Sequence, residues 1–329
     1  MFVGMRIAYS FVEFFCITVQ GLKMEFQKTL KKTIEINGTG LHSGQPVNLK
    51  IKSAGAGEGY IVRRVDLKPA VDIPVKVDNI VDTTLATVVG TKAATVSTVE
   101  HCFAALRALG VDNAIVEVDG PEFPILDGSA APYVDKILDA GFSIQRSARR
   151  YLKVIKPIRV KDGDKFCILR PANGFSVTYS IDFDGSFPGA QNFFIEVTGE
   201  SFVTELSRAR TFGFLSDVEK LKSIGKARGA SLENAVALHE GKVLNPEGLR
   251  MKGELVRHKI LDAVGDIAFV GLPVEGHLIV HKGGHEMHRR LVEALLSRPD
   301  AWVVVSSADE KPLFTPIPRE FGRVVAAHG

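Results

Sequence analysis

Cysteine is scarce in this chain of 329 residues, which contains three, Cys16, Cys102 and Cys167. Their number is odd and they are scattered, so they show neither the spacing of metal ligands nor a disulfide framework. We therefore expect a reducing compartment, the cytoplasm. Any metal ion must then be held by histidines and carboxylates.

Other absences narrow the class of protein further. The formal net charge of +3 is too small to argue for nucleic-acid binding. No Walker-type loop, Gly-x-Ser-x-Gly elbow or dinucleotide fingerprint occurs. The apolar stretch at residues 1–23 is interrupted by Glu13 and is too short to span a bilayer. The sequence thus predicts no transmembrane segment and leaves peripheral contact with a membrane surface open.

Strand and helix patterns begin near Met24. We treat residues 1–23 as an extension outside the fold, either disordered or the product of an upstream start codon. A polar, basic joint at 146–152 separates two predicted domains, 24–146 and 152–329. Hydrophobic periodicity predicts strands at 46–53, 60–65, 84–89, 114–118, 152–160, 166–169 and 276–281, and helices at 97–109, 202–209 and 254–269.

The two halves end alike, in a helix, a short strand and a helix. Their first helices share a related tetrad, TVEH at 98–101 against LVRH at 255–258. This favours an α+β fold of two pseudo-repeated domains, each a β-sheet layered with helices. Such a pairing would bring His101 and His258 to equivalent helix positions at the interdomain cleft, where ligand sites often lie.

His258 and Asp262 are four residues apart, on one face of a helix if the segment is helical. An imidazole and a carboxylate at this spacing supply two of the three protein ligands of a hydrolytic zinc site. Most of the surrounding residues are apolar, so polar side chains here need partners. The alternative is an ion pair on an exposed helix face. Lys259 beside them suits a phosphate group if the helix lines a cleft.

Glu100 and His101 could supply the missing groups. His101 would complete a set of two histidines and Asp262, which suits zinc and also admits ferrous iron. Glu100 points about 100° away around the helix, which favours a general base beside the metal rather than a further ligand. The alternative is a carboxylate at a helix start next to a core histidine.

A third group of histidines surrounds HKGGH at 281–285, where a strand pattern gives way to a helix pattern. His285 follows two glycines that permit a tight backbone path, which suits a general acid or a cation facing an oxyanion. Asp266 could fix its tautomer and raise its pKa. We interpret the remaining three as a surface patch: His277, His281 and His288.

Two loops carry weaker signals. GTGLHSG at 38–44 could let the backbone approach a ligand, or could be a β-turn. SRARTFG at 207–213 offers hydroxyls, arginines and an aromatic ring suited to anion and oxyanion contacts. Its alternative is a helix end with favourable cations and a glycine stop.

Taken together and in this order, these motifs resemble the UDP-3-O-acyl-N-acetylglucosamine deacetylases of lipid A biosynthesis. The resemblance covers residues 24–305 and rests on GTGLHSG (38–44), STVEH (97–101), PILDGSAAP (124–132), SRARTFG (207–213), VRHKILDAVGD (256–266) and KGGH (282–285).

The resemblance implies a zinc amidase that removes acetate from the nitrogen of a UDP-glucosamine carrying a 3-O-hydroxyacyl chain. It implies two α+β domains around the site, each with an insert, the second at about 214–250. The roles that it implies are metal ligation by His101, His258 and Asp262, catalysis by Glu100, Thr211, Asp266 and His285, and lining of the sugar-diphosphate route by His42, Lys259 and Phe212.

Two rival functions remain beside this one. A zinc amidase acting on another N-acetyl sugar would use the same metal chemistry. A non-catalytic UDP-sugar-binding protein with a structural zinc would need no Glu100, Thr211 or His285, and structural zinc sites are usually closed and rich in cysteine. We expect a monomer whose partner is a small-molecule substrate.

Overall fold

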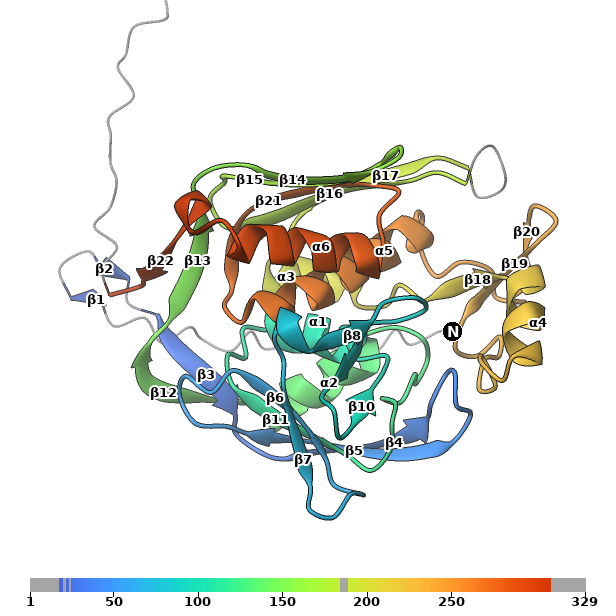
Figure 1. The fold of residues 1–329 in the computed structure, drawn as a ribbon, viewed down its shortest axis with the longest axis horizontal. Coiled ribbons are helices and arrows are strands. Elements are labelled where there is room, and N and C mark those ends of the chain that lie inside the picture. Colours follow the sequence, from blue (N-terminus) through green and yellow to red (C-terminus); the bar gives the residue numbers. More distant parts are fainter. Residues whose placement is uncertain (1–17, 20–21, 24, 184–188, 309–329) are drawn as a thin grey trace, which may run out of the picture.

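The computed structural model describes residues 18–19, 22–23, 25–183 and 189–308. Two β-sheets form the outer layers, and the longer helices lie between them (Figure 1). This arrangement confirms the predicted α+β class. Most of the predicted extension, residues 1–23, lies outside the described residues, apart from the antiparallel pair β1 (Thr18–Val19) and β2 (Leu22–Lys23).

The first sheet belongs to the N-terminal half and has the strand order β4-β5-β11-β6-β7. Apolar side chains alternate along its strands, so that one face is buried against the helices. The strands are β4 (Ile34–Thr39), β5 (Pro46–Ser53), β6 (Tyr60–Arg64), β7 (Val71–Pro74) and β11 (Ala114–Val118).

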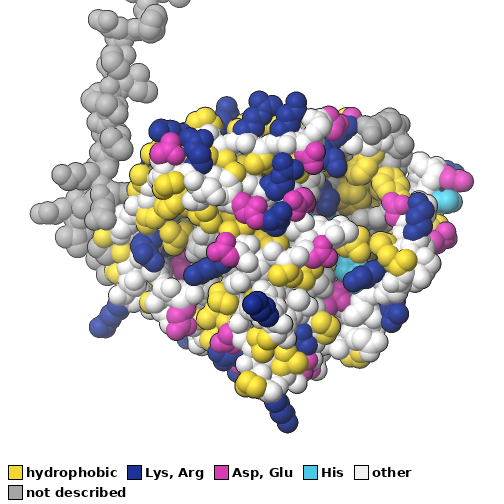
Figure 2. All heavy atoms as spheres, in the orientation of Figure 1, with side chains coloured by type: hydrophobic (Ala, Val, Ile, Leu, Met, Phe, Trp, Pro, Cys, Tyr) yellow, Lys and Arg dark blue, Asp and Glu magenta, His cyan; other side chains and the backbone are white. Residues whose placement is uncertain are grey.

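The second sheet belongs to the C-terminal half, and five of its strands lie in the order β14-β15-β21-β16-β17. They are β14 (Ile158–Asp162), β15 (Lys165–Arg170), β16 (Phe175–Ile181), β17 (Gln191–Glu196) and β21 (Val274–His281). Two further strands, β13 (Arg150–Val154) and β22 (Trp302–Ser306), extend the sheet beside the start of β21. Its outer face is open to solvent, and lysine and arginine side chains gather along it (Figure 2).

Five strands of the second sheet, β14-β15-β21-β16-β17, follow the same order and directions as the five of the first, which confirms the predicted repeat. In each, the strand after the first long helix pairs antiparallel with one neighbour and parallel with the other: β11 with β5 and β6, β21 with β15 and β16. The predicted equivalence of the two histidines is wrong, however. His101 is the second residue of α1 (Glu100–Ala108), whereas His258 is the fifth of α5 (Glu254–Ile267). Relative to the shared tetrad, α5 begins three residues earlier than α1.

The long helices meet between the sheets. α1 and α5 cross so closely that a Cβ atom at Gly265 would lie 2.1 Å from the carbonyl oxygen of Glu100. Only glycine therefore allows this approach of the two halves. The other helices of this layer are α2 (Ala131–Ala140) and α6 (His285–Leu296).

Some predicted elements are divided in the structure. The strand predicted at 152–160 is two strands, β13 and β14, because Pro157 has no backbone N–H and breaks the ladder between them. The strand predicted at 84–89 is instead a small sheet of β8 (Ile80–Asp82), β9 (Val88–Gly90) and β10 (Thr95–Val96). The helix predicted at 202–209 begins earlier, with α3 (Gly199–Ser201) and a π-turn at Phe202–Leu206.

Further strands and a helix lie outside the two main sheets. β3 (Phe26–Leu30) pairs with β12 (Phe142–Ala148). In the region of the predicted second insert, α4 (Leu215–Ser223) packs beside a sheet of β18 (Phe212–Phe214), β19 (Val236–His239) and β20 (Lys242–Val243). Short 3-10 turns occur at Val77–Asn79, Ala268–Val270 and Pro299–Ala301. None of the helices among the described residues is long and apolar enough to cross a membrane.

Candidate active site

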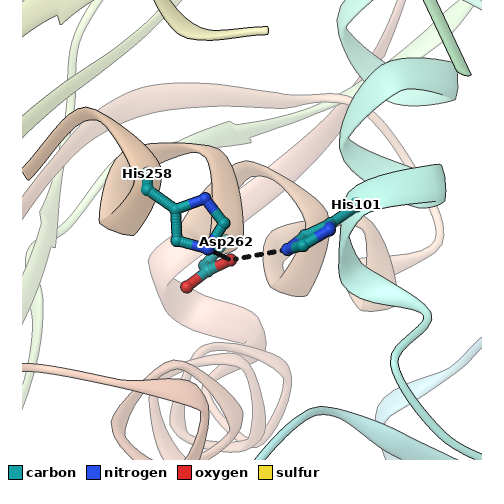
Figure 3. Close-up of side chains that lie close together, drawn as sticks. All are labelled: His101, His258 and Asp262. Carbon is teal, nitrogen blue, oxygen red and sulfur yellow. Dashed lines mark ion pairs between the residues drawn. The ribbon is translucent and has the colours of Figure 1, made fainter. Parts of the chain in front are cut away.

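Two imidazoles and a carboxylate converge where α1 crosses α5 (Figure 3). Asp262 Oδ1 lies 3.3 Å from His258 Nε2 and 3.5 Å from His101 Nε2. All three side chains are at least 95% buried. The structure thus brings together the three residues that the sequence nominates as metal ligands.

The geometry and chemistry of this cluster fit a divalent metal ion. With metal–ligand bonds of about 2.0–2.1 Å, two ligands of a tetrahedral ion are about 3.3–3.4 Å apart. The two measured separations, 3.3 and 3.5 Å, match this value. Asp262 Oδ1 is buried and has no hydrogen-bond partner among the described residues. A buried carboxylate oxygen facing two imidazoles without a hydrogen bond is what a cation would satisfy.

The surroundings of the cluster set the protonation states of two of its ligands, His258 and Asp262. His258 Nδ1 lies 3.0 Å from the carbonyl oxygen of Ala209, so this nitrogen carries the proton and Nε2 keeps its lone pair. Burial lowers the pKa of His258 to about 3, which keeps the ring neutral. Burial alone raises the pKa of Asp262, but His258 and Lys259 hold it well below its usual range. His258 and Asp262 are therefore in the protonation states that a metal requires.

Lys259 lies beside this cluster and is partly exposed to solvent. Its Nζ donates to Asp262 Oδ2 at 2.9 Å and lies 5.5 Å from the centre of the Phe212 ring. A quarter of its side-chain surface is exposed. Burial lowers its pKa, but Asp262 reverses this and leaves the pKa raised, so the ammonium keeps its charge. A fixed cation beside an aromatic ring suits an anionic, sugar-bearing ligand.

Glu100 is the first residue of α1, beside the ligand His101. Thr98, with φ of 60°, turns the chain from β10 into this helix. The Glu100 side chain is 5% exposed, and its Oε2 accepts a hydrogen bond from the Thr87 N–H at 3.2 Å. Burial raises the pKa of Glu100, although His285 and His101 oppose this. A carboxylate with a raised pKa next to a metal site suits the general-base role.

His285 faces Glu100 from the other side. It is the first residue of α6, directly after Gly284, and its Nε2 lies 4.0 Å from Glu100 Oε1. Its Nδ1 lies 2.8 Å from Asp266 Oδ2. Burial lowers the pKa of His285, but Asp266 outweighs it and raises the pKa to about 9. The ring is therefore a cation at neutral pH, held by the carboxylate that the sequence nominates for it.

Of three other nominated residues, Phe212 is in contact with the cluster. Phe212 packs edge-on against the His258 ring, with centroids 6.3 Å apart. Thr211, next to it, is fixed by its backbone N–H, which donates to the Gly128 carbonyl at 2.8 Å. The His42 backbone N–H donates to Glu122, and neither ring nitrogen of His42 has a partner among the described residues. Burial lowers the pKa of His42, so a neutral ring is available to a ligand.

Comparison with known proteins decides the family. A family model described as UDP-3-O-acyl N-acetylglycosamine deacetylase matches residues 27–297. The chain belongs to this family. It is a family of metalloenzymes, in agreement with the donor set of His101, His258 and Asp262.

Curated relatives carry the name UDP-3-O-acyl-N-acetylglucosamine deacetylase. The protein of Shewanella frigidimarina (strain NCIMB 400) is 48% identical over 286 residues, covering 86% of this chain and 94% of the relative. That of Syntrophus aciditrophicus (strain SB) is 45% identical over 283 residues, covering 86% and 90%. That of Shewanella woodyi (strain ATCC 51908 / MS32) is 46% identical over 299 residues, covering 90% and 98%.

Two residues of this deacetylase-family site escaped the sequence analysis. Thr87 Oγ1 donates to Asp266 Oδ1 at 2.5 Å, and nothing in its sequence context marks it. The interpretation of His288 as a surface residue is wrong: its side chain is fully buried, and its Nδ1 lies 2.8 Å from Asp266 Oδ2. The spacing of three from His285 places both rings on one face of α6, which could have indicated this. His277 and His281 do lie on the outer face of β21.

Proposed function

We propose that this chain hydrolyses the N-acetyl group of UDP-3-O-(3-hydroxyacyl)-N-acetylglucosamine, releasing acetate in the committed step of lipid A biosynthesis. One observation carries the proposal: the buried carboxylate of Glu100 lies between a three-ligand metal cluster and the His285–Asp266 pair. A binding protein or a structural metal site needs no such combination.

The roles follow from the geometry. A zinc ion held by His101, His258 and Asp262 would supply a Lewis acid for the acetamide carbonyl and the attacking water. Glu100 takes the proton of that water, because its buried carboxylate lies beside the cluster. His285 donates a proton to the departing amine from Nε2, the nitrogen that faces Glu100.

Four further residues then contact the substrate. The Thr211 hydroxyl stabilises the oxyanion that forms as water adds to the carbonyl. Lys259, His42 and Phe212 line the route of the sugar diphosphate, where the fixed charge of Lys259 meets the phosphates. The chain would form two domains, residues 24–146 and 152–329, and the acyl chain would lie in the insert of the second domain at about 214–250. We further propose a monomer that acts in the cytoplasm, in keeping with the free, buried thiols Cys102 and Cys167.

A substrate comparison tests the proposal. Acetate release should be measured from UDP-N-acetylglucosamine with and without the 3-O-hydroxyacyl chain, each before and after treatment with a chelator. We expect the acylated substrate to react at least about 100-fold faster, because remote binding energy is used to orient the reacting amide. Chelation should abolish both reactions. Equal rates on the two substrates would instead indicate an amidase for another N-acetyl sugar.

The pH dependence tests the role of His285. Its pKa is raised above the usual histidine value to about 9, so the proton is present at neutral pH and is lost as the pH rises through about 9. We expect kcat to fall as this proton is lost, so that the profile of kcat against pH has a basic limb near pH 9. In His285→Gln, kcat should be lower by about 10²–10⁴-fold and should show no such limb. A variant profile that still bends near 9 would assign the limb to another group.

A further inference from the structure

Asp266 receives more hydrogen bonds than the orientation of one histidine requires. Its Oδ1 accepts from Thr87 Oγ1 at 2.5 Å. Its Oδ2 faces both His285 Nδ1 and His288 Nδ1, each at 2.8 Å. The three partners come from the loop before β9 and from two positions on α6, and Asp266 itself lies on α5. One carboxylate oxygen is thus shared by two imidazoles.

The second imidazole is held in place from its far side. An ionised carboxylate only accepts hydrogen bonds, so His288 Nδ1 must carry a proton and donate a hydrogen bond to Asp266. His288 Nε2 lies 3.4 Å from the hydroxyl of Tyr179, and the two rings pack edge to face with centroids 5.9 Å apart. Both side chains are fully buried. His288 therefore has two anchors and no contact with solvent.

We propose that His288 is a positioning residue for deacetylation, which holds Asp266 so that His285 presents Nε2 to the reacting amide. The proposal rests on the proposed function of the site. His288 acts on the substrate through Asp266, which it shares with His285, and through the His285 ring, against which its own ring packs edge-on with centroids 6.4 Å apart. Thr87 fixes the other oxygen, so that the carboxylate plane cannot rotate away from His285.

Sharing the carboxylate also affects how readily His285 gives up its proton. The negative charge of Oδ2 is divided between two donors rather than directed at one. Without His288, the whole acceptor capacity of Oδ2 would fall on His285 and hold its proton more tightly. A proton donor that binds its proton too tightly transfers it slowly to the leaving amine. His288 thus serves both the orientation and the acidity of His285.

Two substitutions separate this role from simple packing. His288→Leu fills a similar volume but cannot donate, whereas His288→Asn keeps an N–H near the position of Nδ1. We expect kcat of the zinc-loaded Leu variant to fall about 10–100-fold with KM within about twofold, and its basic limb to move to higher pH. The Asn variant should recover kcat to within about threefold of the parent protein. His277→Leu, on the outer face of β21, is the matched control and should change neither.

A spectroscopic measurement does not depend on turnover. Nδ1 protons held by a carboxylate resonate far downfield, so the parent protein should show two such imidazole signals, and His288→Asn should show one. Wild-type kcat and pH profile in His288→Leu would overturn the proposal, as would a single downfield signal in the parent protein. If the parent protein released no acetate from any UDP-sugar, the proposed function would fail, and the two signals would still report whether the carboxylate is shared.

Discussion

Replacing Glu100 by alanine should lower kcat by about 10²–10⁴-fold while the metal content stays at one ion per chain. This corresponds to about 3–5 kcal/mol of lost transition-state stabilisation. The reason is that Glu100 is a buried carboxylate next to the ligand His101 and is not itself one of the ligands. Acetate release and metal analysis on the same preparation measure both quantities.

A matched control uses a carboxylate far from the site. Glu35 lies on β4, is 65% exposed and pairs with Lys50. Its replacement by glutamine should leave kcat and metal content unchanged. Wild-type turnover in Glu100→Ala would remove Glu100 from the mechanism. Loss of the metal in that variant would mean that Glu100 is a ligand rather than a base.

Removing the metal should have the second large effect. Chelation, or replacement of His258 by alanine, should reduce activity below detection, and one equivalent of zinc should restore the chelated parent protein but not the variant. The metal should also stabilise the fold, because it binds the folded cluster and not the unfolded chain. At a free ion concentration of 1,000 times Kd, the gain in the free energy of unfolding is about 4 kcal/mol. Thermal unfolding with and without the ion measures it.

The controls for this experiment separate the cluster from other histidines. His277 bonds with Arg170 and Thr178 on the outer face of the second sheet, so His277→Gln should keep the ion and the activity. Ferrous iron, added in place of zinc under anaerobic conditions, tests whether the donor set admits both ions. An active chelated protein would contradict a metal-dependent mechanism. A melting temperature that does not respond to the ion would contradict binding at a buried cluster.

Much of the site could be predicted because helical spacing is local. The separation of four residues places His258 and Asp262 on one face of α5 whatever the rest of the chain does. Apolar neighbours then predicted burial, and both side chains are at most 3% exposed. The glycines before His285 likewise predicted its place at a helix start. A Cβ atom at Gly283 would lie 2.3 Å from a Val280 methyl group, which explains why a glycine stands there.

Contacts between distant segments could not be predicted in the same way. Thr87 lies 179 residues from Asp266 in the chain and carries no periodic signal. His288 looked like a surface histidine because its neighbours are charged, Glu286 and Arg289. It is buried because α6 turns that face towards Tyr179 of β16. The division of β13 from β14 at Pro157 was readable in principle, since proline interrupts a strand.

The sequence by itself determined the chemistry of this protein: which residues can bind a metal, which can move a proton, and that cysteine takes no part. These properties belong to side-chain types and short spacings, which survive without a fold. Only the tertiary structure decided that His101 meets Asp262 at 3.5 Å, through a helix crossing that Gly265 permits. It alone decided that Asp266 serves two histidines. Such distances depend on how two sheets and their helices pack, and packing is a property of the whole chain.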